Sequence, residues 1–317
     1  MEERVSSGGL SGYIVSMMLF DVNRLETDAL GDPHKCPADS FLIRVQGSDG
    51  EINILLDGAK KGQGRQIVIP YLLEQGITTL DCVILSHAHS DHFGGLVDLL
   101  NDPRFTVRQF VYSPIDDEIV RQSDDGDNYS FWMELRERLR THPNVLELNE
   151  NDVGTSLRFG SKLSFDVVST PDREYLGRHS HVDLNDFNIV LRLRYGRFTA
   201  LMTGDCGVYQ ANRILNSPQK EMIRSVTMLK AAHHGGDAST TEEFIRECGA
   251  PIVVVPCNET VVEHRPSFIR NMHLFGRLGA KVLRADWSKR IQVNTDGNAV
   301  ECVLETEWFT EKTFMKL

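Results

Sequence analysis

The sequence has no apolar run long enough for a membrane helix, which needs about 20 consecutive apolar residues. The most apolar N-terminal stretch, 13–20, has neither a basic start nor a small-residue cleavage site, which favours a strand over a signal peptide. We therefore expect no membrane partner and a cytoplasmic location.

Basic residues are also in short supply. The 34 lysines and arginines are outnumbered by 45 aspartates and glutamates, so the formal net charge is −11. Broad electrostatic binding of nucleic acid depends on neutralising phosphates with Lys and Arg, and this balance argues against it. A locally basic groove, or a small anionic substrate held by a metal, stays compatible with the composition.

Cysteine pairs are missing as well. The six cysteines are thinly spread and form no CxxC motif. In a chain of this length without a secretion signal, we expect free and mostly buried thiols instead of a disulfide framework.

What remains is the composition of an ordinary globular protein. Hydrophobic residues make up 41% and charged residues 25% of the 317 residues, which is enough for a sizeable core. We expect a single domain over 1–317, with a frayed Gly/Ser-rich N-terminus at 1–12. The irregular region 113–150 is interpreted as an insertion near the site mouth, a lid, with a plain surface helix as the alternative.

The pattern of apolar residues predicts an α/β fold. Twice, the chain runs through strands and then alternates strands with helices, which suits two sheets packed face to face with helices outside. The expected strands are 13–20, 40–45, 51–56, 80–85, 163–168, 188–194, 198–203, 226–229, 252–256 and 281–284. The expected helices are 66–74, 96–100, 131–140, 210–215, 241–248 and 267–278.

The strongest chemical signal is HAHSDH at 87–92, directly after a buried strand. Imidazole nitrogens and carboxylate oxygens suit Zn²⁺. His87 and His89, two apart in an extended turn, can chelate one ion, while Asp91 and His92 can face a neighbouring ion. The C-terminal end of a strand is where α/β proteins usually place their chemistry. We therefore expect a metal centre here and not a polar surface loop.

Two further loops after apolar strands offer ligands. Asp205 can bridge two metals with its carboxylate, although alone it would be interpreted as a turn residue or helix cap. Of His233 and His234, one can bind metal while the other contacts substrate or passes a proton. His264 precedes a helix whose N-terminus can hold an anion. Its alternative interpretation is an exposed loop histidine.

HAHSDH after a strand resembles the metal-binding motif of the metallo-β-lactamase superfamily. The segments ADSFLI (38–43), LDG (56–58), 186–205, LKAAHHGG (229–236) and EHRPS (263–267) look like successive blocks of one branch. That branch includes the hydrolase domain of the ComEC-type competence proteins and the phosphorylcholine esterase. The resemblance covers most of 13–290. It implies a metallo-β-lactamase-type αβ/βα four-layer sandwich and, usually, phosphodiester hydrolysis.

The resemblance also implies a ligand set. The first metal would take His87 and His89, the second would take Asp91, His92 and one of His233 and His234, and Asp205 would bridge. His264 matches a late histidine of the family that is a ligand or a catalytic contact. Many members carry one more first-site histidine before the bridging aspartate. Here that place falls to His179 or His181, or to Asn185 or Asn188, and the first metal would then be weakly held.

The expected function is a metal-dependent hydrolase, most simply a phosphodiesterase or nuclease that uses a metal-activated hydroxide. One or two zinc ions are expected, with manganese or iron as alternatives, and Asp91, His234 and His264 are the expected catalytic residues. The expected substrate is a small or single-stranded phosphodiester. The rivals are hydrolysis of a lactone, thioester or β-lactam, a redox di-iron enzyme, and a non-catalytic binding protein of this fold. The di-iron class typically has an acidic residue where His89 stands.

Overall fold

The computed structural model of the chain describes residues 10, 14–20, 37–47, 50–172, 183–236, 241–258, 262–263, 265–288 and 290–317. His34, His179, His181, His264 and most of the insert 23–37 lie outside these residues, as does Cys36. Every helix in the described ranges is too short or too polar to cross a membrane.

The first sheet has nine strands in the order β18-β17-β16-β1-β2-β3-β5-β7-β8. Antiparallel strands β1 to β3 open the chain, and β5, β7 and β8 then run parallel to β3. The bounds are β1 Ile14–Leu19, β2 Phe41–Gly47, β3 Gly50–Leu56, β5 Cys82–Ile84, β7 Phe110–Tyr112 and β8 Val145–Glu147. A separate parallel pair is formed by β4 (Thr79–Leu80) and β6 (Thr106–Val107).

The second sheet repeats this plan with seven strands in the order β15-β14-β13-β12-β11-β10-β9. Four antiparallel strands come first, and three strands parallel to β12 follow. The bounds are β9 Ser156–Phe159, β10 Leu163–Ser169, β11 Val190–Tyr195, β12 Phe198–Met202, β13 Met228–Lys230, β14 Ile252–Val255 and β15 Lys281–Arg284.

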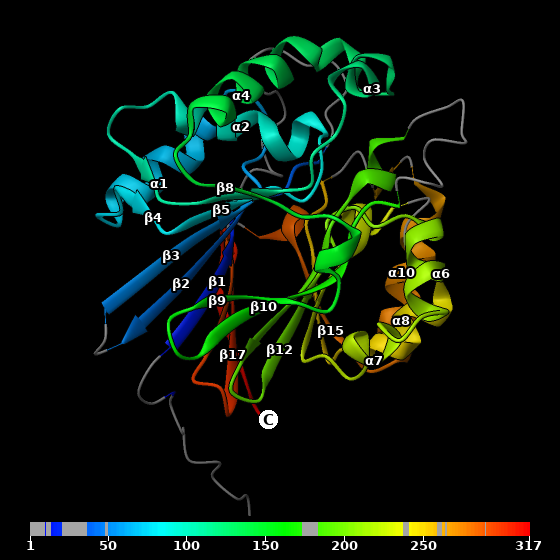
Figure 1. Ribbon diagram of the computed structural model, residues 1–317. Helices are drawn as coiled ribbons and strands as arrows, with labels where there is room; N and C mark the ends of the chain where they lie inside the picture. The colour runs from blue at the N-terminus through cyan, green and yellow to red at the C-terminus, as the bar shows by residue number, and fades with distance from the viewer. Residues whose placement is uncertain are drawn as a thin grey trace, which may run out of the picture.

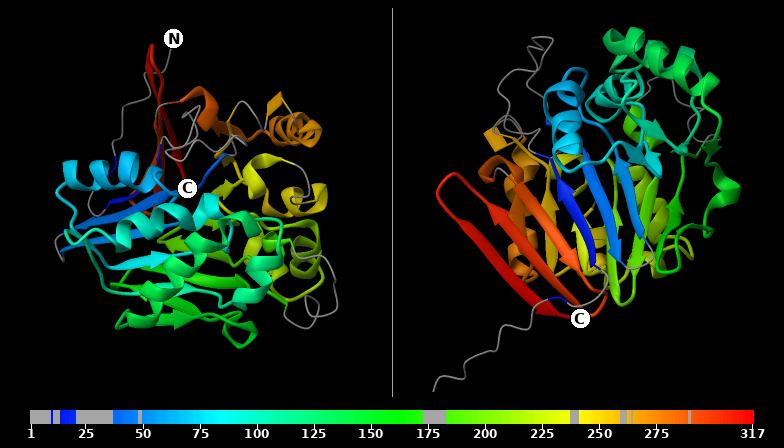
Figure 2. Two further views of the ribbon diagram at one scale, coloured as in Figure 1. Left: turned by 90° about the horizontal axis from the view of Figure 1, so that it is seen from above. Right: turned by 90° about the vertical axis from the view of Figure 1, so that its left-hand side faces the viewer.

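The helices cover the outer faces of both sheets (Figures 1 and 2). Over the first sheet lie η1 Gly64–Val68, α1 Ile69–Glu74, α2 Ser90–Leu100, α3 Asp117–Gln122, η2 Gly126–Asn128 and α4 Tyr129–Thr141, with η3 Glu150–Asp152 in the connection to β9. With the second sheet come η4 Leu184–Phe187, α6 Val208–Leu215, α7 Lys220–Ile223, η5 Ala232–Gly235, α8 Glu242–Cys248, α10 Pro266–Arg277 and η6 Ala285–Trp287.

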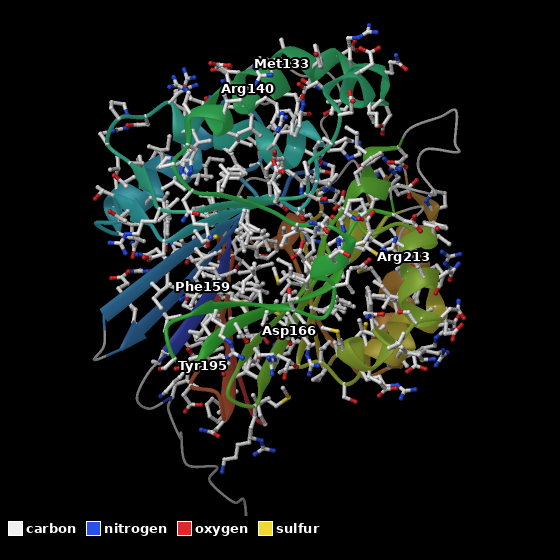
Figure 3. All side chains as sticks on the ribbon, viewed as in Figure 1. Met133, Arg140, Phe159, Asp166, Tyr195 and Arg213 are labelled. Atoms are coloured by element: carbon white, nitrogen blue, oxygen red, sulfur yellow. The ribbon has the colours of Figure 1, made fainter. Side chains whose placement is uncertain are left out.

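Apolar side chains fill each interlayer space. Ile43, Phe165 and Met202 are buried between the two sheets, where sticks crowd the centre of Figure 3. On the outer face of the first sheet, Phe93 of α2 packs edge to face on Trp132 of α4, with ring centroids 5.5 Å apart. Burying a side chain of this size contributes about 1.5–3 kcal/mol. The layers are those of the predicted four-layer sandwich.

Several short elements, among them β7, β8, β9 and α3, were not expected from the sequence, and two larger differences concern the end of the chain and the start of α2. The chain ends with three strands that were not predicted, β16 Arg290–Thr295, β17 Ala299–Glu305 and β18 Thr310–Lys316, and β16 pairs with β1. Helix α2 starts at Ser90 and not at 96, so Asp91 and His92 lie in its first turn. An aspartate is favourable there because the helix dipole is positive at its N-terminus.

Candidate metal centre

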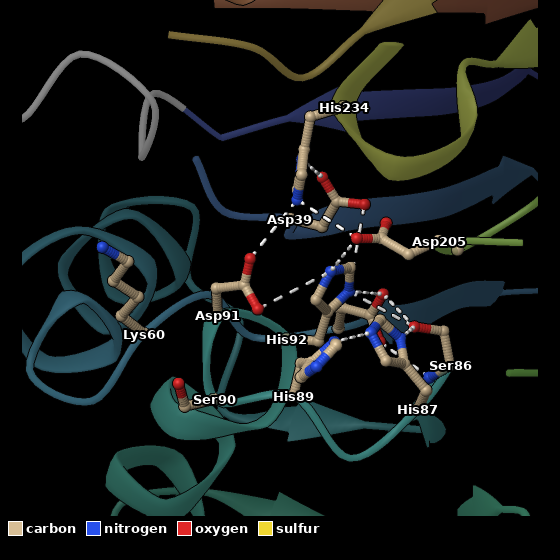
Figure 4. A network of polar contacts seen from close by, with 12 residues as sticks. Asp39, Lys60, Ser86, His87, His89, Ser90, Asp91, His92, Asp205 and His234 are labelled. Carbon is tan, nitrogen blue, oxygen red and sulfur yellow. Dashed lines mark hydrogen bonds and ion pairs between the residues drawn. The ribbon is translucent and has the colours of Figure 1, made fainter. Parts of the chain in front are cut away.

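The predicted ligands gather where loops of both sheets meet, at the carboxyl ends of parallel strands. Strand β3 leads into Asp57, β5 into the segment 86–92, β12 into Asp205, and β13 into His234. Figure 4 shows His92 in the middle of the group, with His234 on one side and His87 and His89 on the other. Strands that are far apart in the sequence therefore supply one site.

Close backbone packing places the first turn of α2 over the end of β3. The amide of Gly58 donates to the carbonyl of His92 at 2.7 Å, and the amide of Gly95 donates to that of Ala59 at 2.8 Å. A Cβ at Gly95 would lie 1.9 Å from the carbonyl oxygen of Gly58, so only glycine allows this approach. The packing brings Asp57 within reach of His92.

Four side chains converge in the manner expected for the second metal. Asp205 Oδ2 lies 3.4 Å from His92 Nε2 and 3.3 Å from His234 Nε2. Asp91 adds its carboxylate, with Oδ2 at 3.3 Å from His234 Nε2 and Oδ1 at 4.0 Å from His92 Nε2. Two imidazole nitrogens and two carboxylates around one point form a donor set that suits zinc.

The hydrogen-bond partners of the buried histidine nitrogens show whether these residues suit a metal ion. His92 Nε2 and His234 Nε2 are both buried and make no hydrogen bond to any described residue. The opposite ring nitrogens are held, because Asp57 Oδ2 lies 2.8 Å from His92 Nδ1 and the Pro256 carbonyl lies 2.9 Å from His234 Nδ1. Metal-ligating histidines almost always have such a partner on the other nitrogen. The arrangement therefore fits a metal ion.

A second group of donors adjoins the first. His87 Nε2 lies 2.9 Å from His89 Nδ1, and Asn185 Oδ1 lies 3.1 Å from the same nitrogen of His89. His87 Nδ1 is held by Ser86 Oγ at 3.0 Å. The candidate first metal position is formed by three donor atoms, His87 Nε2, His89 Nδ1 and Asn185 Oδ1. Asp205 adjoins this position, because donor atoms of His87, His92 and Asp205 lie within 4.8 Å of one another.

Asn188, the other asparagine considered for this position, has a supporting role. Its Oδ1 accepts from the backbone amide of Asp205 at 3.2 Å, and its Nδ2 donates to the carbonyl of Thr203 at 2.7 Å. Gly204 has φ +51°, and a Cβ there would lie 2.0 Å from Asn188 Oδ1. Asn188 thus fixes the loop that carries Asp205, while Asn185 points to the candidate first position.

Burial opposes every charge in this cluster, and neighbouring charges decide which ones persist. Burial, together with His92 and His89, lowers the pKa of His87 and keeps its imidazole neutral. Burial also disfavours the charged forms of His92 and His234, but the nearby carboxylates together outweigh it and raise the pKa of both. Asp205 contributes most in each case, followed by Asp57 at His92 and by Asp39 at His234. A divalent cation would displace these protons, because a ligating imidazole must be neutral.

Sequence reasoning missed the roles of Asp39 and Lys230, which are both buried. Lys230 Nζ lies 2.5 Å from Asp39 Oδ2 and 3.1 Å from Asp205 Oδ1. Burial disfavours ionisation of Asp205, yet His234 and Lys230 lower its pKa well below the usual range. Lys230 therefore holds one oxygen of Asp205 and leaves the other facing the two histidines.

The remaining candidates are placed as follows. His233 and His234 both have left-handed backbones, with φ of 46° and 56°, a conformation that costs roughly 1–3 kcal/mol per residue. This turn directs His234 into the cluster. His233 is outside every group of described residues whose donor atoms lie within 4.8 Å of one another. His264, expected to be catalytic, lies outside the described residues.

Replacing Asn185 with histidine is expected to tighten binding at the first position. An imidazole is a stronger zinc ligand than a neutral amide oxygen, so the dissociation constant should fall by about tenfold, which corresponds to about 1.4 kcal/mol. Zinc titration against a competing chelator measures this change. Asn188→His serves as the contrast and should destabilise the Asp205 loop instead. Unchanged zinc affinity of the Asn185→His protein would contradict this assignment of Asn185.

Comparison of the sequence with known proteins gives two matches. Residues 35–122 match the model of the metallo-beta-lactamase superfamily. The chain is 26% identical over 234 residues to ComE operon protein 3 of Bacillus subtilis (strain 168). The alignment covers 72% of this chain and 26% of that protein, so the chain spans about a quarter of the relative's length.

One solved structure supports the same fold, and a second aligns more weakly. The metallo-beta-lactamase fold protein YhfI from Bacillus subtilis aligns with a TM-score of 0.50 and 14% identity, over 86% of this chain and 97% of that chain. Zn²⁺-bound PqqB from Methylobacterium extorquens aligns with a TM-score of 0.48 and 12% identity, over 84% and 97% of the two chains. The predicted metallo-β-lactamase fold and the resemblance to the superfamily and a ComEC-type protein are confirmed.

Proposed function

We propose that this chain, which has the metallo-β-lactamase fold, is a metal-dependent hydrolase that cleaves phosphodiesters at a two-cation centre. The fold suggests metal-dependent hydrolysis in general. The observation that carries the proposal is the convergence of the donor atoms of buried His92, His234 and Asp205 with those of half-buried Asp91, beside a second group formed by His87, His89 and Asn185. Cations held at these two positions would suit in-line displacement at phosphorus, because a two-metal centre can stabilise both the attacking and the leaving oxygen.

Asp91 and Asp205 have different roles in the proposed hydrolysis. When bound, the cations supply an activated water and neutralise the charge that develops on the phosphate oxygens. Asp91 is half-buried, which disfavours its charge, but His92 and His234 outweigh this and lower its pKa. Its carboxylate therefore stays ionised and can accept a hydrogen bond from the attacking water, which orients the water. Asp205 contacts His92 and His234 through Oδ2 and shares a group of donor atoms with His87, so its carboxylate would join the two positions.

Contacts with the substrate are assigned to the histidines that the donor groups do not use. His233 is half-buried, and its buried Nδ1 makes no hydrogen bond to the described residues. We assign it a contact with a phosphate oxygen or the leaving group. We also assign His264 a catalytic contact with the substrate. The proposed substrate is a small or single-stranded phosphodiester. Zinc suits the His/Asp donors, and the oxygen of Asn185 also suits manganese.

Metal content and turnover test the proposal together. The purified protein should hold about two zinc or manganese ions, as a two-metal site requires, and should hydrolyse bis(p-nitrophenyl) phosphate until EDTA removes them. His92→Ala should lose metal and turnover. His273→Ala, which changes an exposed histidine of α10, should lose neither. A protein that binds no metal would refute the metal centre. A metal-loaded protein that cleaves lactones or thioesters, and no phosphodiester, would refute the phosphodiesterase.

A further inference from the structure

The loop 123–128, between α3 and α4, reaches the candidate first metal position. Asp124 Oδ2 lies 3.0 Å from His89 Nε2. The other oxygen of the same carboxylate, Oδ1, accepts from the backbone amide of Leu184 at 3.4 Å. Leu184 begins η4, the short helix that carries Asn185. One carboxylate therefore contacts both the histidine and the segment that bears the asparagine.

The loop is itself fixed to the start of α2. The neighbouring Asp125 accepts from the backbone amide of Ser90 at 2.7 Å and from its hydroxyl at 3.2 Å. Asn128 donates to the same Asp125 at 2.7 Å, and Ser123 Oγ donates to the carbonyl of Val120 at 2.7 Å. These hydrogen bonds hold the backbone on both sides of Asp124. Asp124 therefore approaches His89 from a loop whose position is defined.

The partners of the two ring nitrogens of His89 explain the role of its contact with Asp124. Nδ1 faces His87 Nε2 and Asn185 Oδ1, so it is the nitrogen available to a metal. Nδ1 can bind a metal only when the ring proton is on Nε2, and that proton needs an acceptor. Asp124 is placed to accept it. The contact thus selects the tautomer and the ring orientation that the first position requires.

We propose that Asp124 is the positioning residue of the first metal position, which it assembles by holding His89 and the Asn185 segment with one carboxylate. The inference rests on the proposed two-cation centre. The loop 123–128 belongs to the region 113–150. Part of that region therefore positions metal ligands and does not only cover the site. A metal at the first position should therefore depend on this loop, while a metal held by His92 and His234 should not.

Metal titration of three variants tests the inference. Asp124→Ala removes the acceptor, Asp124→Asn keeps an acceptor oxygen without its charge, and Asp127→Ala changes an exposed aspartate of the same loop. With zinc and a competing chelator, Asp124→Ala should weaken the first position by about 10–100-fold, the usual effect of losing such a partner. Asp124→Asn should fall between Asp124→Ala and the unaltered protein. Asp127→Ala should match the unaltered protein.

Cobalt absorption spectra show which position is affected. The Asp124→Ala protein should lose the visible bands of the first position at low Co²⁺ and keep those of the second. Equal weakening of both positions, or unchanged affinity in Asp124→Ala, would overturn the inference while leaving the two-cation proposal in place. If the unaltered protein binds neither Zn²⁺ nor Co²⁺, the proposed function fails first, and the inference fails with it.

Discussion

Replacing Asp205 with asparagine is expected to reduce phosphodiester hydrolysis by about 10³-fold or more without unfolding the protein. Asp205 Oδ2 lies within 3.4 Å of the free nitrogens of both His92 and His234 at the second position, and Asp205 also shares a group of donor atoms with His87 of the first position. A neutral amide cannot join two cations as a carboxylate does. Metal stabilisation of the transition state amounts to several kcal/mol, and each 1.36 kcal/mol changes the rate about tenfold, so losing roughly 4 kcal/mol gives this factor.

The measurement combines kcat/KM for bis(p-nitrophenyl) phosphate with metal content and thermal unfolding. Lys230 keeps Asp39 as a partner in the Asp205→Asn protein, so the melting temperature should change little. Asp102→Asn, which breaks an exposed pair with Arg104, is the matched control and should keep full activity. An Asp205→Asn protein with normal metal content and normal rate would contradict the bridging role.

The positions of the main candidate ligands could be predicted because they follow apolar strands. Parallel strands that end at the same edge of a sheet bring their following loops together, so HAHSDH, Asp205 and the His233/His234 pair were expected near one another. Sequence could not decide between the two adjacent histidines. That choice depends on three successive left-handed residues, His233, His234 and Gly235, and two of these are not glycine.

The supporting residues were harder to find. Asp57 stands before Gly58 and has the appearance of a turn residue, yet its carboxylate is buried and binds Ser86 and His92. The side-chain partners of Asp39 in the described part of the chain, Lys230, His234 and His92, are distant from it in the sequence. Lys230 did carry a signal, since it ends an otherwise apolar strand, and a charge buried there requires a partner. The identity of that partner is set by tertiary packing.

The C-terminal strands were missed for a different reason. In β16, polar Arg290, Gln292 and Asn294 alternate with buried Ile291 and Val293. Such alternation predicts a strand with one buried face, but the pattern is short. Its pairing partner, β1, lies at the opposite end of the chain. The antiparallel contact between the ends of the chain is therefore a property of the fold that local pattern does not specify.

Replacing Lys230 with methionine is expected to lower the free energy of unfolding by about 3–5 kcal/mol, the usual cost of removing one partner of a buried ion pair. The Lys230 side chain is 2% exposed and lies 2.5 Å from Asp39 and 3.1 Å from Asp205. Methionine preserves most of the volume, so packing changes little. The destabilisation arises because two buried carboxylates lose the cation between them. Urea unfolding in the presence of EDTA measures it.

Two comparisons separate the lost charge from lost packing. Adding Asp39→Asn to Lys230→Met removes one of the stranded charges and should recover part of the stability, whereas a pure packing defect would worsen. Zinc should also stabilise Lys230→Met more than the unaltered protein, because a divalent cation supplies positive charge beside Asp205 and binds the folded state. If the double variant is no more stable than Lys230→Met, and zinc stabilises both proteins equally, Lys230 does not balance the charge of this site.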